Sequence, residues 1–169
     1  MEGKYLNLGF RGLKEVLETV IDCETNGLLD VVDRVHCLSY KDETIRDKPV
    51  SLTDYSDIKE FFKQDRIFIG HHIIGYDLPA LLKVLQITKP KRIVDTYPLA
   101  ATLLLGRSSY GLDSFGKDYG IPKPKVDDWE NLTIEEYVFR CEEDVKINWR
   151  LWEDLKRKLM ELYGEAVTR

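Results

Sequence analysis

The chain has 169 residues, of which 43% are hydrophobic and 33% charged, and its formal net charge at pH 7 is −5. This length suits one globular domain, and the acidic balance argues against a protein that grips long duplex DNA by neutralising many phosphates. The longest apolar run is about half as long as a membrane-spanning helix, so we expect no membrane association. Three cysteines without Cys-x-x-Cys spacing argue against a disulfide framework or structural zinc and favour a cytoplasmic location.

Strand-like and helix-like segments alternate along the chain. Residues 1–18 are predicted to form an N-terminal extension, either a helix or an extended arm, before a domain that covers residues 19–169. Period-two and short apolar runs predict strands at 17–25, 31–41, 66–71 and 92–96, with a shorter edge strand near 44–50. Helical spacing predicts helices at 55–64, 76–87, 97–106 and 111–120, the last of them ended by Gly120.

The last predicted helix has the clearest pattern in the chain. Thr133 and Glu136 have the spacing of a capping box. Apolar residues then recur at helical spacing, at Val138, Cys141, Val145, Trp149, Trp152, Leu155 and Leu159. Strands that alternate with helices after an opening hairpin predict an α/β fold, with a mixed central β-sheet flanked by helices.

Two acidic residues lie together at the end of the first predicted strand. Asp22 and Glu24 are two residues apart, so the alternation of a strand places both side chains on one face. Two carboxylates this close repel each other and need a solvated or metal-bound setting to stay ionised. An Asp-x-Glu pair alone also occurs by chance in many chains.

Two further acidic residues begin or interrupt helices. Asp77 lies at the start of a predicted helix, where the helix dipole favours an anion, and a simple N-cap is the structural alternative. Asp144 lies inside the last helix next to Glu142 and Glu143, where the alternative is a solvated helix face. The ordered set of four favours a shared site, because Mg²⁺ and Mn²⁺ prefer oxygen ligands from several elements.

Five segments of the chain carry a family resemblance: VIDCETNGLL, IGHHIIGYDLPALL, IVDTYPLAATLL, YGLDSFGKDYGIPK and RCEEDVKINWRLWEDL. They resemble the DEDD-superfamily 3′→5′ exonucleases, most closely the proofreading domains of phage family A DNA polymerases, from residue 19 to the C-terminus. The resemblance implies a ribonuclease H-like fold and a phage or bacterial source. It also implies that Asp22, Glu24, Asp77 and Asp144 are catalytic ligands of two Mg²⁺ or Mn²⁺ ions.

The same resemblance implies where the nucleic acid binds. Residues 25–28 should line the pocket for the terminal nucleotide, with Thr25 near the 3′-hydroxyl, Asn26 beside it and Leu28 wedged against the last base. An ordinary core leucine is the alternative for Leu28. Lys123, Lys125 and Arg107 are expected to be ordinary surface residues, with contacts to backbone phosphates near the site as the alternative, and Asp95 is expected to be structural.

Two positions depart from the family pattern. His72 stands where the family has Asn, and we interpret it as a tolerated hydrogen-bonding substitute that touches the substrate, or else as a packed histidine. Arg140 stands where the family has a water-orienting Tyr, and Phe139 where other members have His. Arginine cannot act as a base at neutral pH. Our hypothesis is that divalent ions activate the water, with Arg140 assisting electrostatically and Tyr137 a poor candidate base.

The sequence therefore predicts a metal-dependent 3′→5′ exonuclease that acts on the 3′ ends of single-stranded DNA, or of RNA, and releases nucleoside monophosphates. We expect it to act alone or as a separate proofreading partner of a DNA polymerase. The alternative is a weak or inactive exonuclease-like module that binds nucleic-acid ends or a protein partner. Retention of all four carboxylates argues against that alternative, because mutually repelling charges are costly to assemble without a use.

Overall fold

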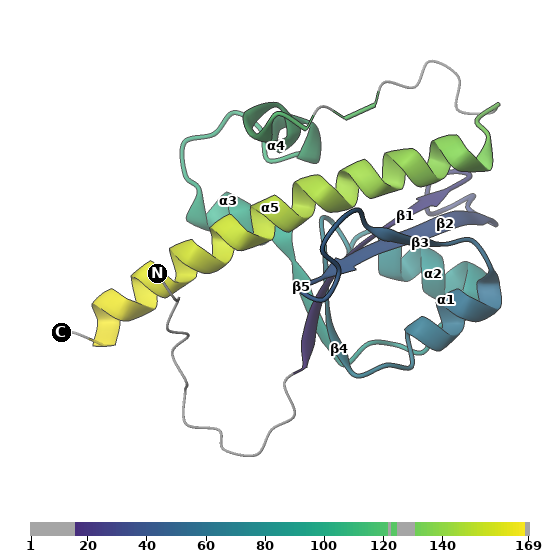
Figure 1. Ribbon diagram of the computed structural model, residues 1–169, viewed down its shortest axis with the longest axis horizontal. Helices are drawn as coiled ribbons and strands as arrows, with labels where there is room; N and C mark the ends of the chain where they lie inside the picture. The colour runs from purple at the N-terminus through teal and green to yellow at the C-terminus, as the bar shows by residue number, and fades with distance from the viewer. Residues whose placement is uncertain (1–15, 122, 125–130, 168–169) are drawn as a thin grey trace.

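The structure, a computed structural model, describes residues 16–121, 123–124 and 131–167. In this part of the chain, five strands form one mixed sheet with helices on both faces, which confirms the predicted α/β arrangement (Figure 1). The strands are β1 Leu17–Thr25, β2 Val35–Asp42, β3 Val50–Leu52, β4 Arg66–Gly70 and β5 Arg92–Asp95. Their order across the sheet is β3-β2-β1-β4-β5. β2 is antiparallel to β1 and β3, whereas β4 is parallel to β1 and β5 is parallel to β4.

The central strand β1 has two different halves. Its first half pairs with β2 on one side and with β4 on the other, where the register runs from Leu17 opposite Arg66 to Val20 opposite Ile69. Its second half continues along β2 alone as far as a register shift between Glu24 and Thr25. The end of β1 is therefore open on the β4 side, and side chains from other elements reach it there.

The predicted edge strand at 44–50 is displaced toward the C-terminus, since β3 covers only Val50–Leu52. Lys41 explains the displacement, because its Nζ donates to the main-chain oxygens of Ile45 at 2.6 Å and Asp47 at 3.1 Å. These bonds hold the segment before β3 as a turn around one ammonium group.

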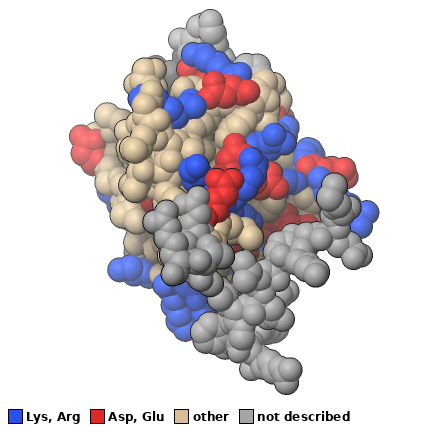
Figure 2. All heavy atoms as spheres, turned by 90° about the vertical axis from the view of Figure 1, so that its left-hand side faces the viewer, with Lys and Arg blue, Asp and Glu red and all other residues tan. Residues whose placement is uncertain are grey.

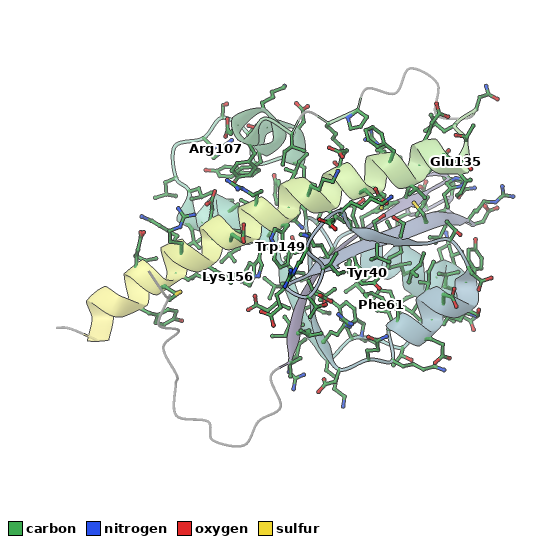
Figure 3. The ribbon with its side chains drawn as sticks, viewed as in Figure 1. Tyr40, Phe61, Arg107, Glu135, Trp149 and Lys156 are labelled. Carbon is green, nitrogen blue, oxygen red and sulfur yellow. The ribbon has the colours of Figure 1, made fainter. Side chains whose placement is uncertain are left out.

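The helices cover both faces of the sheet. They are α1 Tyr55–Phe61, α2 Asp77–Leu85, α3 Thr96–Leu103, α4 Leu112–Tyr119 and α5 Ile134–Val167. α1 and α2 pack against one face, which the strands supply with Ile21 and Phe68. α3, α4 and α5 pack against the other face, onto the neighbouring Val20 and Ile69. Adjacent residues of a strand thus pack into the hydrophobic cores on opposite faces of the sheet, as the alternation of side chains in a pleated strand requires. Tyr40 of β2 meets Phe61 of α1 with ring centroids 4.4 Å apart (Figure 3).

α5 begins at the predicted capping box. The Thr133 amide donates to Glu136 Oε2 at 2.7 Å, and the Glu136 amide donates back to Thr133 Oγ1 at 3.2 Å. Cys141 and Val145 are fully buried, and Asp144 lies in the same buried stripe with 3% of its surface exposed. Asp144 is therefore on the face of α5 that packs on the molecule, and the alternative of a solvated helix face is wrong.

α4 lies close to α5 because of a glycine. A Cβ on Gly116 would lie 2.5 Å from the Ile121 oxygen and 2.9 Å from Ile147 Cδ1, so only glycine permits this approach. Gly120 ends α4 in the left-handed conformation, with φ of 68°, as predicted. No helix in the described part of the chain combines the length and apolarity needed to cross a membrane.

Candidate active site

The four predicted carboxylates line one hollow of about 360 Å³, named here the acidic hollow. Asp22 and Glu24 come from β1, Asp77 is the first residue of α2, and Asp144 lies on α5. Three elements that are distant in sequence therefore bring their acidic residues to the open end of β1. One ligand oxygen each of Asp22, Glu24 and Asp144 lies within 4.8 Å of the other two.

Asp77 stands slightly apart from that group and is held by the backbone of β1. Its Oδ1 accepts a hydrogen bond from the Cys23 amide at 3.1 Å, a donor that faces the open side of β1. The N-cap of α2 is Tyr76, so the alternative that Asp77 is a simple N-cap is wrong. The bond instead fixes the helix that carries Asp77 to the strand that carries Asp22 and Glu24.

Burial raises the pKa of all four carboxyl groups. The pKa of Asp22 is raised well above its ordinary value by burial, and the charges of Asp144 and Asp77 raise it further. Burial raises the pKa of Glu24 to about 7, although Arg140 opposes the shift. Burial likewise raises the pKa of Asp77 to about 6. Burial therefore opposes ionisation of the clustered carboxyl groups, and a nearby cation would favour their ionised form.

Two basic side chains reach the carboxylates. Arg140 Nε lies 3.0 Å from Glu24 Oε1, with only 12% and 13% of the two side chains exposed. Lys123 Nζ lies 2.7 Å from Asp144 Oδ2. Arg140 also donates through Nη1 to the Pro124 oxygen at 2.8 Å, which ties the residue after Lys123 to α5. Arg140 therefore lies beside Glu24, one of the candidate metal ligands, where its charge can act electrostatically as we expect.

The donor set fits a hard divalent cation. Asp144 Oδ1 is buried without a hydrogen-bond partner among the described residues. A buried carboxylate oxygen in that state is costly, and a cation would compensate it. The clustered donors are all carboxylate oxygens, which suits Mg²⁺ or Mn²⁺ better than a softer metal.

A second hollow of about 640 Å³ adjoins the first, and Cys23, Glu24 and Tyr76 line both. Residues 25–28, which we expect to bind the terminal nucleotide, line this second hollow, and it is named here the Leu28 hollow. Leu28 itself is 74% exposed, so the alternative of a core leucine is wrong. Tyr76 shapes the hollow by hydrogen bonds of its hydroxyl to Thr25 Oγ1 and the Gly27 oxygen.

Asn26 and Tyr137 also line the Leu28 hollow, but other contacts hold them. Asn26 closes the connection between β1 and β2, since its Nδ2 donates to Asp33 Oδ1 at 2.7 Å and its Oδ1 accepts from the Arg34 amide at 3.0 Å. Tyr137 is 6% exposed, and its ring stacks on His36 at 3.9 Å between centroids. Tyr137 is not among the residues that line the acidic hollow.

His72 and His71 both line the acidic hollow, in different settings. His72 is exposed and has φ of 64°, and its ring stacks on Tyr97 at 3.8 Å between centroids. Asp95 holds this turn by accepting from the amides of His72 at 2.9 Å and Ile74 at 3.2 Å. Asp95 also caps α3 through the Tyr97 amide at 3.1 Å, so its predicted structural role is confirmed.

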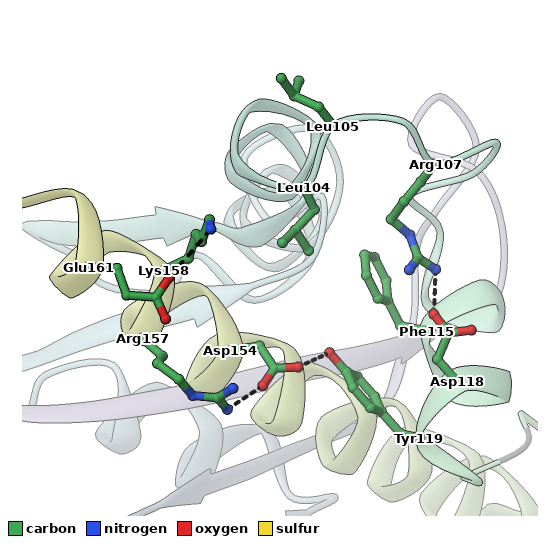
Figure 4. Close-up of a pocket in the computed structure, with 10 residues that line it drawn as sticks. All are labelled: Leu104, Leu105, Arg107, Phe115, Asp118, Tyr119, Asp154, Arg157, Lys158 and Glu161. Carbon is green, nitrogen blue, oxygen red and sulfur yellow. Dashed lines mark hydrogen bonds and ion pairs between the residues drawn. The ribbon is translucent and has the colours of Figure 1, made fainter.

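The Arg107 segment lies elsewhere. Arg107 pairs with Asp118 at 2.7 Å and covers the Phe115 ring at 4.2 Å (Figure 4), and it donates to Ser114 Oγ at 2.9 Å. Arg107 is not among the residues that line the acidic hollow, so these contacts agree with an ordinary surface position. Arg107, Phe115 and Asp118 border a separate hollow of about 510 Å³ between α4 and α5. On the face shown in Figure 2, acidic and basic side chains are interspersed. Lys125 lies outside the described residues.

Three residues of the site have roles that the sequence did not indicate. Lys123 pairs with Asp144, Tyr76 separates the two hollows, and Cys141 places its Sγ 3.4 Å from Asp22 Oδ2. Tyr76 and Cys141 both lie in the family-like segments, directly before Asp77 and three residues before Asp144, whereas the sequence indicates Lys123 only as an alternative phosphate contact.

The fold of this chain is similar to that of several solved structures. Neither a protein-family model nor a curated protein sequence matches the chain. Solved structures do match. NrnC of Brucella melitensis with bound Mg²⁺ has a TM-score of 0.66 at 18% identity, over 89% of this chain and 76% of NrnC. NrnC bound to pGG matches with the same TM-score of 0.66 at 17% identity.

Two larger proteins match over part of their length. Escherichia coli RNase D, an exoribonuclease involved in structured RNA processing, has a TM-score of 0.62 at 20% identity, over 88% of this chain and 41% of RNase D. The family B DNA polymerase of Pyrobaculum calidifontis has a TM-score of 0.63 at 15% identity, over 84% of this chain and 25% of the polymerase. These matches confirm the predicted ribonuclease H-like fold, with its mixed sheet between helices.

Proposed function

We propose that the chain is a divalent-metal-dependent 3′→5′ exonuclease that hydrolyses the terminal phosphodiester bond of single-stranded DNA and releases nucleoside monophosphates. One observation carries the proposal. Four buried or half-buried carboxylates from three elements line a hollow in which Asp144 Oδ1 has no partner among the described residues. Such a cluster is costly without a cation, and its oxygen donors suit Mg²⁺ or Mn²⁺.

Asp22, Glu24, Asp77 and Asp144 would hold the metal, as two ions according to the sequence resemblance. When bound, the ions would activate the attacking water and stabilise the leaving oxygen. The protein's own contribution is to position the substrate. The structure holds Asp77 against the β1 backbone, and the adjoining Leu28 hollow is large enough for a terminal nucleotide.

In this proposal, the exposed Leu28 packs against the last base without reading its identity. Thr25 and Asn26 border the sugar, Tyr137 forms part of the wall of the hollow, and exposed His72 contacts the strand on the acidic side. Arg140 acts electrostatically next to Glu24, since its guanidinium stays charged and cannot serve as a base.

DNA is the first substrate to test because the sequence resembles proofreading domains of phage family A DNA polymerases, and a separate polymerase is the partner this implies. The structural matches widen the test. They include a DNA polymerase, an exoribonuclease, and NrnC bound to pGG. RNA and a dinucleotide therefore belong in the same experiment.

A second candidate function is an inactive module that binds 3′ ends. The observation in its favour is Arg140, which occupies the position of the family's water-orienting Tyr and pairs with Glu24. The two functions differ in turnover, since both allow nucleic-acid binding but only the exonuclease shortens the strand.

The deciding experiment follows 5′-labelled single-stranded DNA, matching RNA and the dinucleotide pGG with Mg²⁺ or Mn²⁺. The control pair is Asp22→Ala in the cluster and Asp65→Ala on the surface, where Asp65 forms an exposed ion pair with Arg92 at 2.6 Å. A ladder that shortens from the 3′ end, lost in Asp22→Ala and kept in Asp65→Ala, supports the exonuclease. Binding without cleavage of any substrate in either metal supports the inactive module.

A further inference from the structure

We propose that Arg140 and Lys123 are internal counter-ions of the carboxylate cluster, which are exchanged for divalent cations and then bind phosphate. Without metal they hold Glu24 and Asp144. Once a divalent cation takes those carboxylates, both basic groups turn to phosphate oxygens of the nucleic acid. The inference rests on the proposed metal site, and it concerns how that site is loaded.

Each of the two basic side chains contacts one of the three clustered carboxylates. Arg140 Nε lies 3.0 Å from Glu24 Oε1, and Lys123 Nζ lies 2.7 Å from Asp144 Oδ2. Glu24 and Asp144 are two of the three residues whose ligand oxygens lie within 4.8 Å of one another. A divalent cation that enters this group must therefore compete for its ligand oxygens with the guanidinium of Arg140 and the ammonium of Lys123.

The charge of the hollow requires some compensation. The four carboxylates carry four negative charges when ionised, and Arg140 and Lys123 offset two of them. Each basic group contacts one of the carboxylates, Arg140 that of Glu24 and Lys123 that of Asp144. The same attraction competes with a divalent ion, because charges a few ångströms apart in a partly buried site interact strongly.

Both basic groups are near each other in the fold. Arg140 Nη1 donates to the oxygen of Pro124, the residue that follows Lys123. Both side chains also line the acidic hollow, beside the carboxylates that would hold the metal. A half-buried basic group that loses its carboxylate is stabilised by another anion, and a phosphate offers oxygens that both guanidinium and ammonium groups bind well.

This exchange predicts opposite effects of the same variants. Lys123→Met and Arg140→Met remove a competitor of the metal, so Mn²⁺ should bind about tenfold more tightly to the free protein. The same variants remove a phosphate contact, so a DNA oligonucleotide should bind about tenfold more weakly to the metal-loaded protein. A merely structural role of either residue would weaken both kinds of binding.

Two binding measurements test this without relying on cleavage. Titration calorimetry gives the Mn²⁺ dissociation constant of the free protein. Fluorescence anisotropy in saturating Mn²⁺ gives the affinity for a single-stranded DNA whose 3′ linkages are phosphorothioates. Lys123→Arg keeps the charge, and Lys117→Met removes a lysine that pairs with Asp113 on α4, so both should resemble the unmodified protein in Mn²⁺ affinity.

Lys123→Met carries the decision if Arg140→Met fails to fold, because Lys123 lies outside the helices and strands. Tighter Mn²⁺ binding with weaker DNA binding supports the exchange. Unchanged or weaker Mn²⁺ binding in Lys123→Met overturns it, even if the protein is an active exonuclease. A protein that shows both opposite effects but never shortens a strand would contradict the proposed function and leave the exchange standing.

Discussion

Cys141 of α5 places its Sγ 3.2 Å from the main-chain oxygen and 3.4 Å from Oδ2 of Asp22 on β1. The cysteine is fully buried, and burial raises the pKa of its thiol well above the ordinary value. The sulfur therefore stays protonated and acts as a weak donor to Asp22. The contact joins the strand of the first carboxylates to the helix of the last one, Asp144.

The Cys141 contact predicts a difference between two substitutions. Cys141→Val removes the donor at similar volume, and we expect it to weaken Mn²⁺ binding severalfold and lower the free energy of unfolding by about 1 kcal/mol. Cys141→Ser keeps a donor and should hold Mn²⁺ affinity close to that of the unmodified protein. Titration calorimetry and urea unfolding measure the two quantities. Equal Mn²⁺ affinity in both variants would reduce Cys141 to a packing residue.

Exposed Leu28 predicts an effect on substrate binding alone. Leu28→Ala should change the free energy of unfolding by less than about 0.5 kcal/mol, because the side chain is 74% exposed. It should raise the KM for DNA about tenfold by removing the surface that packs on the base. Leu105→Ala is the matched control, since Leu105 is 82% exposed beside the hollow between α4 and α5. Equal kinetics of the two variants would exclude the wedge.

The shifted carboxyl groups predict an unusual dependence of stability on pH. Burial raises the pKa of Glu24 from 4.5 to about 7 and that of Asp77 from 3.8 to about 6. The folded state then binds protons that the unfolded chain releases, so these groups lower the stability of the metal-free protein as pH rises through this interval. We expect Tm in EDTA to fall by a few degrees between pH 5 and pH 8, and saturating Mn²⁺ to oppose the fall.

Glu24→Gln is the control for that pH dependence. It removes the group with the pKa of about 7, so the fall of Tm in EDTA should be smaller than in the unmodified protein. Scanning calorimetry at a series of pH values measures both. The same slope in both proteins would show that Glu24 does not bind the proton.

Asp95 predicts a loss of stability without a loss of the metal site. Its carboxylate accepts from the amides of His72, Ile74 and Tyr97. Asp95→Ala leaves these donors and the N-terminus of α3 without a partner, at a cost of about 2 kcal/mol in unfolding free energy. Asp65→Ala should cost less than about 1 kcal/mol, because its ion pair is exposed. Loss of Mn²⁺ binding in Asp95→Ala would make Asp95 part of the site.

Features governed by neighbours in sequence were predictable. The alternation in β1 places Asp22 and Glu24 together, the capping box begins α5, and Gly120 ends α4, because each depends on a few consecutive residues. Membership of the four carboxylates in one site came from the resemblance. Their oxygens come from three elements, so spacing along the chain alone does not show that they meet.

Features governed by distant contacts were missed. Lys123 has the sequence surroundings of a surface lysine, and its pairing with Asp144 follows only from the packing of α5 beside it. The edge strand was misplaced because one side chain, Lys41, binds the carbonyls of the segment that looked strand-like. The exposure of Leu28 was not missed, because a place against the terminal base requires it, but its cause is a distant contact: Asn26 and Tyr76 hold the segment after β1.

The left-handed backbone at His72 restricts which amino acids this position accepts. Its φ is 64°, a region that β-branched residues avoid and that Asn, Asp, His and glycine populate more readily. The family's Asn and this chain's His thus share a conformational tolerance as well as a capacity to donate a hydrogen bond. A library randomised at position 72 and selected only for folding should retain Asn, Asp, Gly and His and lose Val, Ile and Thr.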